Sequence, residues 1–227
     1  MTLTERSRSR ALVGLCGVAG PLLMVASLAI NPAPPPDLSP ADLATWAEPR
    51  AAFMLLGGAM QGIGSLLIVI FALALVRLSG AADGLMACLT HLVGGTILVV
   101  SLIEVGFYLA ATQAIASGDS TLGLVSGGLI RAAEHVFLIA PTLLIPLGLV
   151  LLRTRVLARP FAYSGLVIGA CLQILVLARL FGALQPVVDG VLIVQSAWFA
   201  AAGAALAVSA MRLGPVESPL HGDDLAS

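Results

Sequence analysis

Six long stretches of the chain contain no Asp, Glu, Lys or Arg, and this feature constrains the fold more than any other. In chain order the stretches hold 26, 26, 20, 17, 19 and 22 residues. A helix needs about 20 predominantly apolar residues to cross a bilayer, because it rises about 1.5 Å per residue through roughly 30 Å of hydrocarbon. Each stretch therefore predicts one transmembrane helix, and the fold class is predicted to be an all-α integral membrane bundle of six helices.

Composition supports this class. Hydrophobic residues make up 59% of the chain and charged residues only 10%, whereas a soluble domain carries about 25% charged residues. A freely soluble protein is therefore excluded, and the apolar runs are far longer than the strands of a membrane barrel, about 10 alternating residues each. The transmembrane helices are predicted at residues 11–30, 52–76, 85–112, 128–152, 161–183 and 190–211.

The orientation follows from arginine, since all 11 basic residues are Arg. An even number of spans puts both termini on one side of the membrane. That side carries Arg6, Arg8, Arg10, Arg77, Arg153, Arg155, Arg159 and Arg212, and the opposite loops carry only Arg50. The excess of positive charge predicts that both termini are cytoplasmic. The net charge of −1 gives no reason to expect a nucleic-acid partner.

Two segments lie outside the predicted spans. In the first outer loop, Ser39-Pro40-Ala41-Asp42 has the cap, first-turn proline and acid that begin a helix. We expect a short helix at residues 39–48 lying on the outer membrane surface with Trp46 at headgroup level, the alternative being a mobile proline-rich loop. Residues 213–227 contain two prolines and three acids and are predicted to form a disordered cytoplasmic tail.

Ionisable residues inside the spans are the candidate functional residues, because a charge at the bilayer centre costs about 2.5–3.5 kcal/mol and needs a partner or water. Helical rise places five of them at similar depth on the outer side, with Tyr108 on the same helix as the first. This predicted cluster consists of Glu104, Arg131, Glu134, His135 and Arg179. Arg131 lies three and four positions before Glu134 and His135, so these three can share one helix face.

Three interpretations of the cluster remain open: ion pairs that only fix helix packing, a pocket for a small polar ligand or lipid headgroup, and a metal or catalytic site. Adjacent Glu134 and His135 point about 100° apart on a helix, and two arginines would repel a cation. We therefore predict no catalytic residue, no metal site and no cofactor.

Proline and glycine add two structural expectations. Pro141 and Pro146 interrupt the fourth predicted helix, where they form either a static kink or a hinge that gates the pocket. The pairs Gly58 with Gly62 and Gly165 with Gly169 have the four-residue spacing that permits close helix packing in lipid.

Several motifs in order resemble a known group of proteins. The first span closes in Asn31-Pro32, the outer loop carries Trp46 and Arg50, and the third span carries Glu104 followed by Gly106-Phe107-Tyr108-Leu109-Ala110. This order is similar to the small six-pass inner-membrane proteins of high-GC bacteria that are gathered in domain-of-unknown-function families. The resemblance covers most of the chain and implies the bacterial inner membrane, without implying a reaction.

These observations predict a multi-pass membrane protein that binds or moves a small polar molecule or lipid through an outward-facing intramembrane pocket. The first alternative is a structural or regulatory membrane subunit whose charged cluster only fixes helix packing. An intramembrane enzyme is the third. Six spans are few for a complete transporter, so a transport role would favour a homodimer, and the glycine faces offer a surface for another membrane partner.

Overall fold

The protein is all-helical. The computed structural model describes residues 3–31, 40–119, 121, 123, 125–130, 140, 142–154, 156–179 and 185–212. Helix accounts for 92% of the structure, and the described residues contain no strand. The helices are α1 (Leu3–Ile30), α2 (Pro40–Ala47), the 3₁₀ helix η1 (Glu48–Arg50), α3 (Ala51–Leu78), α4 (Leu85–Ser117), α6 (Leu144–Arg153), α7 (Arg159–Arg179) and α8 (Gln185–Arg212).

Four of these helical segments are long and apolar enough to cross a membrane. They are Ser7–Ile30, Thr45–Leu78, Leu85–Ser117 and Ile193–Met211. Two shorter apolar segments, Leu144–Arg153 and Arg159–Leu175, belong to α6 and α7. Of the six predicted spans, the first, second, third and sixth thus coincide with helices of membrane-spanning length, and the fourth and fifth remain predictions.

The surface is apolar where a water-soluble helix would be polar. Leu12, Leu92 and Val167 expose 64%, 65% and 62% of their surface, while Thr90 and Ser101 are completely buried. Exposed apolar patches of this extent are rare on soluble monomers. In hydrocarbon they are favourable, so the distribution of side chains, together with the four long apolar helices, suggests a membrane protein.

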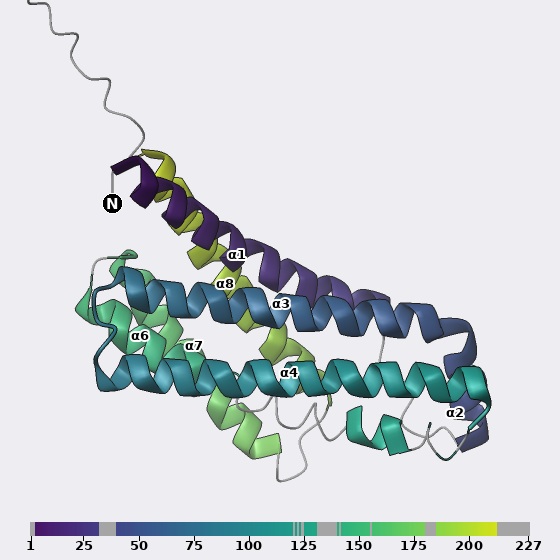
Figure 1. Ribbon diagram of the computed structural model, residues 1–227. Coiled ribbons are helices and arrows are strands. Elements are labelled where there is room, and N and C mark those ends of the chain that lie inside the picture. The colour runs from purple at the N-terminus through teal and green to yellow at the C-terminus, as the bar shows by residue number, and fades with distance from the viewer. Residues whose placement is uncertain are drawn as a thin grey trace, which may run out of the picture.

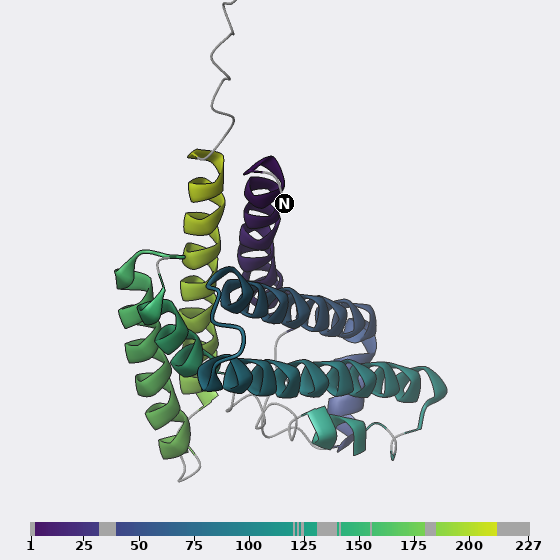
Figure 2. The same ribbon diagram turned by 60° about the vertical axis from the view of Figure 1, so that its left-hand side comes forward.

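The long helices form two antiparallel pairs that cross each other. Helix α1 lies beside α8, and α3 lies beside α4, with α6 and α7 together at one side (Figures 1 and 2). The Ser7 hydroxyl donates a hydrogen bond to the Ala210 carbonyl over 2.8 Å, so the beginning of α1 meets the end of α8. Helix α1 also packs against α3 and thereby joins the two pairs.

Glycines allow the closest of these helix contacts. A Cβ atom on Gly203 of α8 would lie 2.6 Å from the carbonyl carbon of Gly17 and 2.7 Å from the carbonyl oxygen of Gly14, both in α1. Gly20 of α1 and Gly64 of α3 meet in the same way, each lying where a Cβ would be 2.9 Å from the other's carbonyl oxygen. Backbone therefore packs directly on backbone at two places along α1, as small residues permit in membrane helices.

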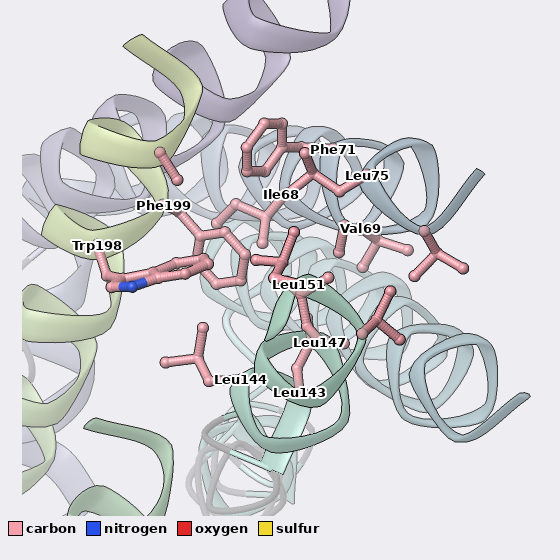
Figure 3. Close-up of a cluster of buried hydrophobic side chains, with 14 of the residues drawn as sticks. Ile68, Val69, Phe71, Leu75, Leu143, Leu144, Leu147, Leu151, Trp198 and Phe199 are labelled. Carbon is pink, nitrogen blue, oxygen red and sulfur yellow. The ribbon is translucent and has the colours of Figure 1, made fainter. Parts of the chain in front are cut away.

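The hydrophobic core lies where α3, α6 and α8 meet (Figure 3). Phe71 of α3 and Phe199 of α8 are completely buried, with ring centroids 6.1 Å apart in an edge-to-face arrangement. Leu147 of α6 is also completely buried against this cluster. Trp198 lies next to Phe199 and donates its indole N–H to the Phe161 carbonyl and the Ser164 hydroxyl of α7. These contacts hold α6 and α7 to the long helices.

The observed helix ends differ from the predicted ones in an instructive way. Helix α1 begins at Leu3 rather than residue 11, and α4 continues to Ser117 rather than residue 112. A charge-free stretch marks the part of a helix that can lie in hydrocarbon, whereas the backbone hydrogen bonding of α1 continues through the charged residues of its first turns. Helix α4 ends at Ser117, and Gly118 follows it with a φ of +70°, the left-handed conformation that glycine adopts after many helices.

The loop helix and the fourth predicted helix also differ in detail. Helices α2 and η1 occupy the segment predicted as a short helix, Ser39 lying outside the described residues, and lead directly into α3. In the fourth segment, residues 125–130 are helical, Thr142 and Leu143 form a 3₁₀ turn, and α6 begins at Leu144. The prediction for residues 213–227 concerns a segment outside the described residues.

Candidate functional site

Helix α4 carries four of its polar residues, Thr90, Ser101, Glu104 and Tyr108, on its buried face. Buried positions recur every three or four residues along it, which is the period of one face of an α-helix. They are Ala87, Thr90, Gly94, Ile97, Ser101, Glu104, Tyr108, Ala111 and Ala114. The outer face is apolar, with Leu92, Val99 and Leu102 exposed. The burial pattern therefore turns Glu104 and Tyr108 towards the other helices.

Glu104 is the charged residue of this face, and α3 supplies a partner for it. The carboxyl side chain is 1% exposed, and Gln61 Nε2 donates a hydrogen bond to its Oε2 over 2.7 Å. A carboxyl group taken out of water requires such hydrogen bonds, because an uncompensated one pays its full desolvation cost. Gln61 thus links the middle of α3 to the buried acid of α4.

Two glycines of α3 bring the helices close enough for this hydrogen bond. A Cβ on Gly58 would lie 2.8 Å from Cδ2 of the Tyr108 ring, and a Cβ on Gly62 would lie 2.8 Å from Cγ2 of Val105. On α3 these contacts lie on either side of Gln61, and on α4 both follow Glu104 within about one turn. The predicted glycine pair therefore lies at the α3–α4 contact, directly beside the buried acid.

The other predicted packing pair lies on α7. A Cβ on Gly165 would lie 3.0 Å from Cζ2 of Trp198, so this glycine makes room for the indole ring of α8. Gly169, one turn later, is buried as well.

The remaining members of the predicted cluster are not placed. Arg131, Glu134 and His135 lie outside the described residues, and so does Pro141. Arg179 ends α7, but its side chain is not among those described. The convergence of the five ionisable side chains consequently stays a prediction, and Glu104 is the member of the cluster whose side chain the structure describes.

Pro146 lies in the first turn of α6. It is the third residue of α6, which begins at Leu144, and it is buried. The first four N–H groups of a helix have no intrahelical partner, so a proline in the first turn removes no helix hydrogen bond. The kink or hinge predicted at Pro141 and Pro146 stays a prediction, because Pro141 and residues 131–139 lie outside the described residues.

The reasoning from sequence missed Gln61. Gln61 is not ionisable, and it lies in a 26-residue stretch without charges. An amide in such a stretch is itself a signal, because a polar side chain in hydrocarbon needs a partner on another helix.

Comparison of the chain with protein-family models, with curated protein sequences and with solved structures gives no match.

Proposed function

We propose that this chain is a multi-pass protein of the bacterial inner membrane that binds or moves a small polar molecule or lipid through an outward-facing pocket containing Glu104. The observation that carries the proposal is the 1% exposed carboxyl of Glu104, held by Gln61 between two helices that are long and apolar enough to cross a membrane. Intramembrane acids are costly and usually mark a substrate, ion or proton pathway.

The chemistry of the pair indicates what a ligand would offer. A carboxylate only accepts hydrogen bonds, whereas the Gln61 amide both donates and accepts them. A molecule carrying an amine, hydroxyl or other donor group would complement Glu104. In this proposal Arg131, Glu134, His135 and Arg179 complete the pocket and supply the cationic side of it.

The proposed topology has six spans and cytoplasmic termini. The contact of Ser7 with Ala210 supports it, because the two ends of the chain then leave the α1–α8 pair at the same end. The arginine distribution supports the cytoplasmic side. A proton-coupled or lipid-binding role would use the outer end of α4, which carries Tyr108 beyond Glu104.

One observation favours a structural alternative. The hydrogen bond from Gln61 to Glu104 joins α3 to α4 and could serve helix packing alone. In that case apolar side chains of similar volume should replace the pair at little cost, as they often do for buried polar or charged pairs.

Native mass spectrometry of protein extracted with its bound lipid tests the proposal. Wild type should release a small molecule or lipid that the Glu104→Gln variant has lost, since the variant keeps the side-chain shape but not the charge. Leu102→Ala, a change at a residue 57% exposed on the opposite face of α4, is the matched control and should retain it. The same set of bound molecules on all three proteins would contradict the proposal and leave the structural role.

A further inference from the structure

A small cavity lies at the junction of the two helix pairs. Its volume is about 30 Å³, and its walls come from α1, α3, α4, α8 and the turn before α6. Ile68 and Leu143, two of its apolar residues, face the hydrophobic core shown in Figure 3. Three polar side chains also line it: Ser65 of α3 and the neighbouring Gln195 and Ser196 of α8. All three are buried, with exposures of 2%, 7% and 7%.

Gln195 has one half of its amide satisfied. Its Nε2 donates a hydrogen bond to the Ala140 carbonyl over 3.3 Å, which ties α8 to the turn before α6. This bond also fixes the orientation of the amide, because a carbonyl can only be approached by the NH₂ side. The Oε1 atom is fully buried and has no hydrogen-bond partner among the described residues. A buried acceptor in that condition costs its full desolvation penalty, roughly 1–3 kcal/mol.

The cavity has the size and polarity to satisfy this acceptor. A water molecule needs a cavity of at least about 10–15 Å³ and typically makes about three hydrogen bonds. A volume of about 30 Å³ meets that requirement and leaves no room for a larger ligand. Ser65 donates its hydroxyl hydrogen to Met24 Sδ over 3.6 Å, so the oxygen of the same hydroxyl keeps its lone pairs as acceptors.

We propose that this cavity is a specific binding site for one ordered water molecule, which donates a hydrogen bond to Gln195 Oε1 and contacts the hydroxyls of Ser65 and Ser196. The water completes the polar contacts that join α8, α3 and the turn before α6 at the crossing of the helix pairs. The proposal is independent of any ligand at Glu104.

A substitution that fills the cavity tests the proposal, because its effect on stability depends on whether the cavity holds water. Ala140 lines the cavity, and Ala140→Val adds two methyl groups to it. If water is bound, valine expels it and leaves Gln195 Oε1 unpaired, so the equilibrium constant for unfolding should rise about tenfold or more. In a Gln195→Met background the acceptor is absent, and the same substitution should have no such effect.

The outcomes separate the explanations. Equal destabilisation by Ala140→Val in both backgrounds would indicate overpacking, and stabilisation in both would indicate a dry cavity; either result overturns the proposal. A crystal structure of the wild-type protein provides a second measurement that needs no variant. It should show one density peak within hydrogen-bond distance of Gln195 Oε1, and an empty cavity at a resolution that shows other buried waters would also overturn it.

Discussion

The hydrogen bond between Gln61 and Glu104 should be measurable as a coupling energy between α3 and α4. The perturbation is Gln61→Met, Glu104→Met and the double variant, since methionine keeps an unbranched side chain of similar length. The bond is 2.7 Å long and its acceptor is 1% exposed, so water replaces it only when the helices separate. Hydrogen bonds to charged groups contribute about 1.5–3 kcal/mol, whereas measured couplings between membrane helices average about 0.6 and reach about 1.7 kcal/mol.

We expect the coupling energy of Gln61 and Glu104 to lie at the upper end of the range measured between membrane helices. Gly58 packs closely on Tyr108 and Gly62 packs closely on Val105, so α3 and α4 are held at the short separation that this hydrogen bond needs. We therefore expect a coupling of about 1–2 kcal/mol. The stability losses of the two single variants, added together, should exceed the loss in the double variant by this amount. A coupling of about 1.4 kcal/mol is a tenfold change in the unfolding equilibrium constant.

The assay is equilibrium unfolding of the purified protein in mixed micelles titrated with a denaturing detergent, with the four proteins of the cycle measured side by side. The cycle isolates the pairwise contribution even though Glu104→Met also removes the other interactions of that side chain. A coupling below about 0.3 kcal/mol, within the usual error of additivity, would refute the reasoning and show that Gln61 does not hold α4 through Glu104.

Three further predictions follow from packing and charge. Gly203→Ala should lower the free energy of unfolding by about 1–2 kcal/mol, because its Cβ would lie 2.6 Å from the α1 backbone. The control Gly95→Ala, whose Cβ would have nothing within 4 Å, should be neutral or slightly stabilising. Unfolding in the same micelles measures both variants, and equal stability of the two would contradict the close contact. In a cysteine-free background, a membrane-impermeant thiol reagent added outside should label Asp42→Cys and not Ala82→Cys, and the reverse pattern would overturn the orientation. Trp198→Phe should lower the free energy of unfolding by about 1–2 kcal/mol, because it removes the hydrogen bonds to the Phe161 carbonyl and the Ser164 hydroxyl that hold α7. Limited proteolysis after Arg159 should become faster, and an unchanged rate would contradict this role of Trp198.

The sequence alone was sufficient to locate the long helices. A charge-free stretch reports where a helix can lie in hydrocarbon, so α3 was expected at residues 52–76 and is observed at Ala51–Leu78. The same rule does not detect helical turns that carry charged residues, which explains why α1 begins at Leu3 and not at residue 11. It also could not predict the 3₁₀ turn before α6, because hydropathy does not distinguish α from 3₁₀ backbone.

In the candidate site, too, one residue could be recognised from the sequence and its partner could not. Glu104 was recognisable from sequence, because a lone acid in an apolar helix is energetically expensive wherever the helix packs. Its partner Gln61 was not, since the two residues are 43 positions apart and only the packing of α3 on α4 brings them together.

Glycine illustrates what only tertiary structure could decide. Four-residue spacing drew attention to Gly58 and Gly62, yet the closest backbone contacts are made by Gly17 and Gly203 at opposite ends of the chain. The spacing of glycines along one helix shows which helix face lacks side chains. Which other helix packs against that face depends on how the helix pairs cross. Composition and charge thus determined that the chain forms apolar helices of membrane-spanning length. The crossing of those helices decided which polar side chains meet between them, because contacts between distant segments are set by packing and not by local sequence.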